Sequence, residues 1–102
     1  MDGELPRPDP IAGDPVATEM LRVWLAHNAP HIAVRLGMWE EAGADEREAW
    51  GYLLADVVRH VSRGLVEQCG GDVGDTTGRI LDAILKYSQD GRGPAQGRFA
   101  DE

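Results

Sequence analysis

The fold of this 102-residue chain is decided by residues 45–68, which read DEREAWGYLLADVVRHVSRGLVEQ. Asp45 is suited to cap the first turn of a helix, and Gly70-Gly71 ends the pattern. The stretch therefore predicts a long amphipathic helix, about 34 Å in length at 1.5 Å per residue. Apolar side chains recur in it at intervals of three and four residues: Trp50, Leu53, Leu54, Val57, Val61 and Leu65.

The segment before this helix, residues 31–38, changes to a period of two. Ile32, Val34, Leu36 and Met38 alternate with less apolar residues, which is typical of a half-buried β-strand. We therefore expect a strand here, followed directly by a tryptophan and an acidic loop that contains glycine.

Two further helices are predicted on either side of these elements. The first runs from Asp14, a suitable cap, to about Asn28. The last begins at Asp75 or Thr76. Its apolar face is formed by Ile80, Leu81, Ile84 and Leu85.

The chain is short enough for one domain, since domains commonly contain about 100–150 residues. Residues 1–13 carry alternate prolines and predict an extended arm. Residues 90–102 are rich in glycine and predict a flexible tail. The expected fold is therefore a small α+β domain over residues 14–89, in the order helix, strand, helix, helix.

A single strand cannot pair its own backbone, and unpaired backbone groups are costly when they are buried. The proline arm is a poor partner because every second donor is missing. Pairing of residues 32–38 with the same strand of a second copy would satisfy the strand and enlarge a small core. The sequence therefore favours a homodimer. The alternative is a strand-like segment that lies across the helices.

The charge balance limits the class of partner. The chain has 10 Lys and Arg against 18 Asp and Glu, for a formal net charge of −8 at pH 7. This balance argues against nucleic acid and against an anionic membrane surface as the main partner. A further protein partner is compatible with it.

The expected cellular location follows from the lack of an apolar run of membrane-spanning length, of a secretory signal and of a cysteine pair in this sequence. No apolar run reaches the length of about 18–20 residues that spans a bilayer, and the N-terminus is acidic without the apolar core of a secretory signal. Cys69 is the single cysteine, so an internal disulfide is excluded. We therefore expect a cytoplasmic protein.

Candidate ligand-binding residues are Arg35, Trp39, Asp56, Arg59 and His60. Trp39 follows the strand and could form the wall of a pocket. Asp56 lies three residues before Arg59 and four before His60, so the three side chains share one face of the long helix. A carboxylate beside a histidine could support acid–base chemistry. The same pattern is also typical of a solvated helix face with an ion pair, which is the more common case.

Metal and cofactor sites are not expected. His27, His31, His60 and Cys69 show none of the close ligand spacings that zinc sites use. No catalytic residue can be assigned from the spacing of side chains.

Three segments together resemble a known family: residues 21–24 (LRVW), residues 37–39 (GMW) and residues 50–60 (WGYLLADVVRH). The family consists of small uncharacterised bacterial proteins, mainly alphaproteobacterial, and is classed as a domain of unknown function. The resemblance covers about residues 14–68 and implies no activity or catalytic residues.

Two functional hypotheses follow. The first is a homodimeric interaction or accessory module without catalytic activity. The alternative is a small-molecule-binding protein or minor enzyme with a polar site around Trp39, Asp56 and His60.

Overall fold

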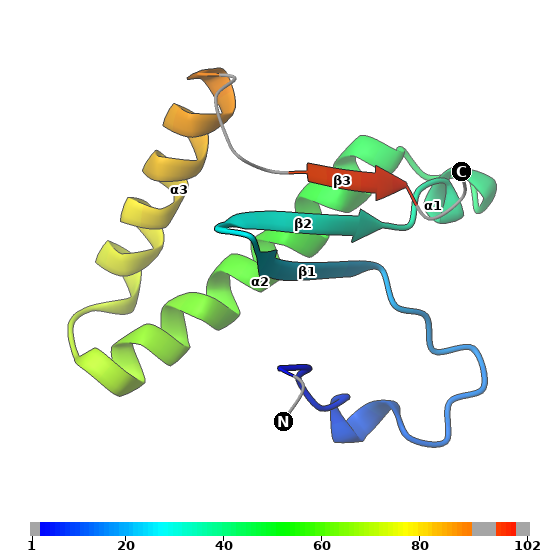
Figure 1. Ribbon diagram of the computed structural model, residues 1–102, viewed down its shortest axis with the longest axis horizontal. Coiled ribbons are helices and arrows are strands. Elements are labelled where there is room, and N and C mark those ends of the chain that lie inside the picture. The colour runs from blue at the N-terminus through cyan, green and yellow to red at the C-terminus, as the bar shows by residue number, and fades with distance from the viewer. Residues whose placement is uncertain (1–2, 91–95, 100–102) are drawn as a thin grey trace.

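The computed structural model describes residues 3–90 and 96–99. Figure 1 shows the sheet beside a pair of long helices that meet at an angle. The α+β class and the small single domain are confirmed. The elements are a 3₁₀ turn at Asp9–Ile11, β1 (Leu21–Ala26), β2 (Ala29–Val34), α1 (Met38–Glu41), α2 (Glu46–Cys69), α3 (Val73–Asp90) and β3 (Gln96–Phe99).

Residues 21–26 form the strand β1, so the prediction of a helix from Asp14 to Asn28 was wrong. β1 and β2 form an antiparallel hairpin whose register runs from Leu21 opposite Val34 to Ala26 opposite Ala29. The loop between them contains two residues, His27 and Asn28, and both have positive φ angles, as a type I′ turn requires. The apolar residues of β1 fit a period of two as well as a helical spacing, so the local pattern allows both structures. Pairing with β2 selects the strand.

Asp14 does act as a local cap, although no helix follows it. Its Oδ1 atom accepts a hydrogen bond from the backbone N–H of Val16 at 2.9 Å, and its carbonyl oxygen accepts one from Ala17 at 3.3 Å. The turn stops there, because the chain continues in an irregular path to β1.

The predicted strand at residues 31–38 exists but is displaced toward the N-terminus. It begins at Ala29 and ends at Val34, and Met38 already belongs to α1. Gly37 lies between the two elements with a φ angle of 98°, which favours glycine and interrupts the extended backbone.

β2 is the central strand of a three-stranded sheet in the order β1-β2-β3. It pairs with β3 in parallel, from His31 opposite Gln96 to Val34 opposite Phe99. The strand is thus satisfied within the chain, and the argument that a lone strand needs a second copy does not hold. β3 falls in the segment where a flexible tail was predicted; residues 91–95 and 100–102 of that segment lie outside the described residues.

The long helix lies where the periodicity predicts it. The Asp45 carboxylate caps α2 by accepting a hydrogen bond from the N–H of Arg47 at 3.0 Å, and Gly70 follows its last residue with a φ angle of 83°. α3 begins a few residues before the predicted start, because Asp72 accepts a hydrogen bond from the N–H of Asp75 at 2.8 Å.

The interior is small. Within the described residues Val58 is the one buried hydrophobic residue, and Ser62 is buried with its hydroxyl donating to the Val58 carbonyl oxygen at 2.8 Å. Both lie on α2, which contacts α3.

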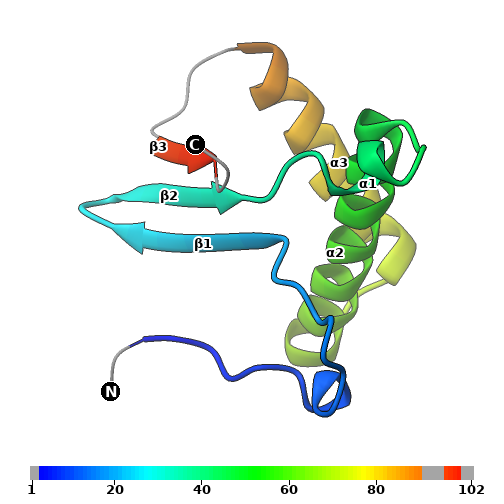
Figure 2. The ribbon, with the colours of Figure 1, turned by 90° about the vertical axis from the view of Figure 1, so that its right-hand side faces the viewer.

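The sheet and the helices form two separate layers, as Figure 2 shows. Among the described elements the strands contact one another, and α2 contacts α1 and α3, but no strand has a Cα atom within 8 Å of a helix. The radius of gyration is 15.6 Å, whereas a compact domain of this length is expected to have about 13 Å. None of the described helices combines the length and apolarity that a membrane span needs.

Candidate functional site

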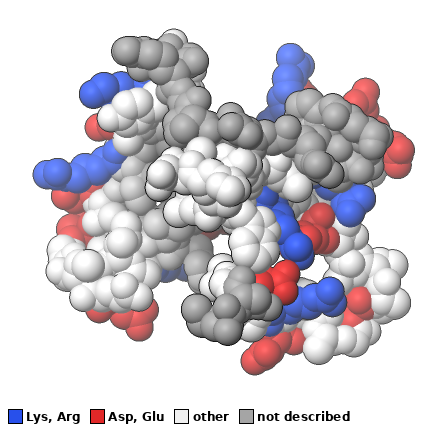
Figure 3. Space-filling model, viewed as in Figure 1, with Lys and Arg blue, Asp and Glu red and all other residues white. Residues whose placement is uncertain are grey.

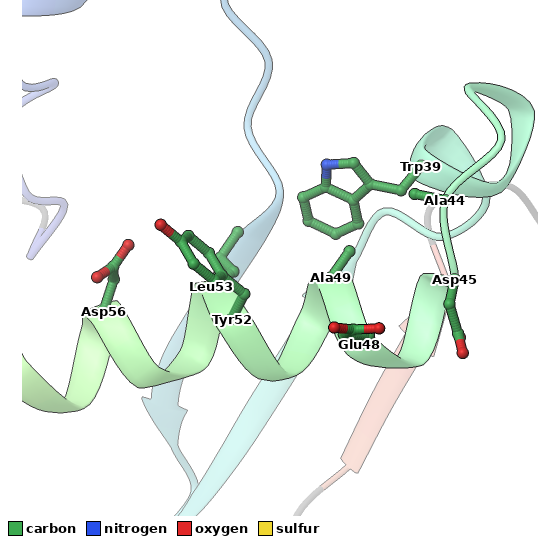
Figure 4. A pocket seen from close by; sticks show the side chains of 8 residues that line it. All are labelled: Trp39, Ala44, Asp45, Glu48, Ala49, Tyr52, Leu53 and Asp56. Atoms are coloured by element: carbon green, nitrogen blue, oxygen red, sulfur yellow. The ribbon is translucent and has the colours of Figure 1, made fainter.

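A depression lies between α1 and the first half of α2, with a volume of about 530 Å³. Figure 4 shows the indole ring of Trp39 above α2, with Ala49 below it and with Tyr52 and Asp56 rising from the helix beside it. We call this depression the Trp39 groove. It is lined by Trp39, Ala44, Asp45, Glu48, Ala49, Tyr52, Leu53 and Asp56.

Trp39 is held in place by a second tryptophan. Its ring lies edge-on to that of Trp50, with the ring centroids 5.6 Å apart and the planes at 88°. This is a favoured geometry for aromatic pairs and stabilises them by about 0.5–1.5 kcal/mol beyond burial. The Nε1 atom of Trp50 donates a hydrogen bond to the Glu46 carboxylate at 3.1 Å, so the supporting ring is itself oriented.

Glu46 connects the two helices at this corner. Its Oε2 atom accepts from the N–H of Gly37 at 2.9 Å, and its Oε1 atom accepts from the N–H of Glu40 at 3.0 Å. These N–H groups belong to the start of α1, where backbone donors have no partner within the helix. The Gly37 N–H donor is the main reason that the pKa of Glu46 lies below its usual value, and the bonds to Glu40 and Trp50 act in the same direction.

The rim of the groove is acidic. The guanidinium of Arg47 holds the pKa of the Asp45 carboxyl below its usual value. Asp56 forms an ion pair with Arg59 three residues later. Glu48 lies between these two carboxylates along the helix and forms no ion pair within the described part of the chain. Three carboxylates beside two aromatic rings favour a positively charged group with an apolar body.

The five residues predicted from sequence do not gather at one place. Trp39 and Asp56 line the groove, and Arg59 is attached to it through Asp56. Arg35 lies in a second depression of about 250 Å³ at the end of the hairpin, where its Nε atom donates to the Glu19 carbonyl oxygen at 3.2 Å. His60 is an exposed residue of α2 that lines neither depression.

Sequence reasoning assigned no role in the site to Glu46. A signal was present, because Glu46 and Trp50 are four residues apart and therefore adjacent on a helix. The bond to Gly37 spans nine residues and a change of element, so no local pattern could show it.

Metal-ligating side chains do not cluster. The described residues contain no group of three or more His, Cys, Asp or Glu that could hold a metal ion. Cys69 is exposed at the end of α2.

The fold and the groove define a small α+β domain with an aromatic, acid-rimmed depression at one corner. The chain belongs to the family described as domain of unknown function DUF5076, whose model matches residues 4–90. The resemblance to a domain of unknown function is thereby confirmed, and the match extends beyond the segments that suggested it.

A solved structure is also similar to the chain. It comes from the photosynthetic bacterium Rhodopseudomonas palustrus CGA009 and is described as a putative pyruvate dehydrogenase. The TM-score is 0.64 at 24% sequence identity, and the match covers 83% of this chain and 81% of that chain. At this identity the likeness concerns the fold alone. No curated protein matches the sequence.

Proposed function

We propose that the protein is a cytoplasmic homodimeric interaction module without catalytic activity of its own. The observation that carries this proposal is the amount of surface that one copy leaves exposed. The accessible surface of the chain is 8676 Å², whereas a folded monomer of its mass is expected to expose about 5,700 Å². The difference is about 3,000 Å².

A second copy of the chain would cover part of a difference of this size. If a partner covered half of the excess on each protomer, the interface would bury about 3,000 Å² in total, which lies in the range of obligate dimers. Such interfaces resemble a domain core divided between two chains. Among its described positions this chain has one buried hydrophobic residue, so most of its apolar side chains are available for such an interface.

The exposed surface is apolar over much of the two long helices. On α2 and α3 large side chains remain between 40% and 60% exposed: Leu54, Val57, Val61, Leu65, Val73, Leu81, Ile84, Leu85 and Tyr87. On the face that Figure 3 shows, charged side chains lie at the edges and also beside the middle, with uncharged surface between them. Apolar patches of this extent mark interaction surfaces in soluble proteins.

Light scattering on a sizing column, at two protein concentrations, tests the proposal. We expect a mass near twice 11.1 kDa at the higher concentration. A mass of 11.1 kDa at both concentrations would contradict the proposal, since the apolar faces would then remain uncovered.

A second candidate function is the binding of a small molecule in the Trp39 groove. The observation that favours it is the preorganised indole of Trp39 beside Tyr52 and the carboxylates of the rim. Titration with choline should shift the amide resonances of residues 44–56, while titration with acetate should not. Trp39→Leu should abolish the shifts with choline, and shifts that survive this change would exclude the groove as their origin.

A further inference from the structure

The β1–β2 hairpin has one apolar face. Residues directly opposite in an antiparallel pair share a face, so the register brings six apolar side chains together on one side of the hairpin. Leu25 is 81% exposed and Val23 is 52% exposed, while the other four residues are partly buried, so this face is open mainly along β1. We call it the sheet face. It consists of Leu21, Val23, Leu25, Pro30, Ile32 and Val34.

α2 presents a matching apolar surface. Leu54, Val57, Val61 and Leu65 recur at intervals of three and four residues and are between 41% and 45% exposed. We call them the α2 stripe. The buried residues Val58 and Ser62 lie beside the stripe, so the packing that buries α2 leaves the stripe itself open.

The α2 stripe is separate from the Trp39 groove. Tyr52, which lines the groove, and Val61, which belongs to the stripe, are nine residues apart, and at 3.6 residues per turn they point about 180° from each other. A partner on the stripe therefore leaves the groove accessible.

A sheet with an apolar face and a helix with an apolar stripe normally cover each other within one domain. Here both surfaces stay partly uncovered: Val23 and Leu25 are 52% and 81% exposed, the α2 stripe is 41–45% exposed, and no strand lies within 8 Å of a helix between Cα atoms in the described part of the chain. The path between the two layers is short: three residues join β2 to α1, and the Gly37 N–H is bonded to Glu46 of α2. The hairpin is therefore anchored at the first turn of α2.

We propose that the two layers are exchanged between protomers. The sheet face of one protomer packs on the α2 stripe of a second copy, and the sheet face of that copy packs on the stripe of the first. The arrangement rests on the homodimer proposed above. A two-fold axis makes the two contacts identical, so a single chain sequence closes both at once.

Charge is consistent with this pairing. The six residues of the sheet face and the four of the stripe are all uncharged. Each chain carries a net charge of −8, so two copies repel each other, and the repulsion is smallest when uncharged surfaces form the contact. An apolar contact between sheet and helix keeps the acidic groups at the periphery.

Cross-linking between co-expressed single-cysteine variants tests the exchange. Cys69→Ser removes the native thiol, after which one chain carries Leu25→Cys on the hairpin and the other carries Val57→Cys on α2. A short bismaleimide should join the two different chains into a covalent dimer, and neither variant alone should form one. Leu65→Cys is a second position on the stripe in case Val57→Cys does not fold. Tyr52→Cys is the matched control on the opposite side of α2 and should not react with Leu25→Cys.

A chain that carries both Leu25→Cys and Val57→Cys separates the remaining outcomes. Exchange predicts a cross-linked dimer, whereas a cross-link within one chain would show that the layers pack in the same protomer. A covalent dimer from either single variant alone would show sheet-to-sheet or helix-to-helix pairing. These results would overturn the exchange with the dimer intact, and a monomeric mass by light scattering would overturn the dimer itself.

Discussion

The corner where α1 meets α2 differs from the middle of α2 in how many side chains find contact partners within the same chain. At the corner, Glu46 accepts three hydrogen bonds and Trp50 supports Trp39, so polar groups and rings have their partners within one protomer. In the middle of the same helix, four large apolar residues are more than two-fifths exposed. Local contacts complete the corner, whereas the apolar stripe stays partly exposed, and we propose that a second chain covers it.

The largest effect should come from a charge on the stripe. Val61→Asp places a carboxylate where we propose that a partner packs, and burial of an unpaired charge is strongly unfavourable. We expect the dimer dissociation constant to rise by at least about 100-fold, equivalent to about 2.8 kcal/mol at 1.4 kcal/mol per factor of ten. Light scattering should then show a monomer.

The matched control is Tyr52→Asp, on the opposite side of α2. It should leave the mass unchanged, because Tyr52 is 73% exposed in the groove. If Val61→Asp changed neither the mass nor the melting temperature, the stripe would be an ordinary solvated surface and the comparison would fail.

The corner should respond to the loss of its central ring. Trp50→Ala removes the edge-to-face contact with Trp39 and the bond to Glu46, and we expect it to lower the free energy of unfolding by about 3 kcal/mol. Trp50→Phe keeps a ring and removes the N–H donor, so it should cost only about 1 kcal/mol. Chemical denaturation measures both values, and equal losses for the two variants would show that packing is not the main term.

Thermal stability should depend on protein concentration if the stripe is covered by a second copy. Folding and association are then linked, and a tenfold increase in protein concentration stabilises the folded dimer by about 1.4 kcal/mol. Added salt should act in the same direction, because it screens the repulsion between two chains of net charge −8. A melting temperature that is independent of concentration over a hundredfold range would argue for a folded monomer.

The smallest effect concerns the pH dependence of the corner. The pKa of Glu46 is lowered in the folded state from the value of 4.5 that applies to the unfolded chain. Its hydrogen bonds therefore stabilise the fold fully above pH 4.5, and this contribution is lost as the pH falls below that value through the folded pKa. Glu46→Gln should show a weaker loss of stability on acidification than the wild-type protein in thermal melts.

Asp45 provides the comparison for this measurement. Its pKa is also lowered, by the Arg47 side chain, so it adds a loss of stability in acid that Glu46→Gln does not remove. The difference between the two melting curves therefore reports on Glu46. Parallel curves for wild type and variant would mean that the bonds to Gly37 and Glu40 do not depend on the charge.

Long-range periodicity explains which elements could be predicted. The prediction for residues 45–68 agrees closely with α2 at Glu46–Cys69, because apolar spacing that is consistent over about six turns fits a helix and no other regular structure. The segment around Leu21 to Ala26 is too short to distinguish two periods, and the helix predicted there was wrong. The pairing partner across the turn at His27 and Asn28 decided it.

The candidate site was predictable only in part, for the same reason. Trp39 and Asp56 were identified from sequence, and the structure brings them to one groove. Arg35 lies in another depression, because β2 ends before the chain turns into α1. The sequence could indicate on which helix or strand each residue lies. It could not show which helices and strands lie beside one another.

By itself the sequence determined the α+β class, the long amphipathic helix, the acidic charge and the family, since composition and periodicity are properties of neighbouring residues. Only the tertiary structure decided that β2 is paired within the chain, that Glu46 holds the start of α1, and that the sheet face and the α2 stripe remain open. The physical reason is that these features depend on which residues meet across intervening segments of chain. The spacing of neighbouring residues carries no information about contacts between residues that are distant in the sequence.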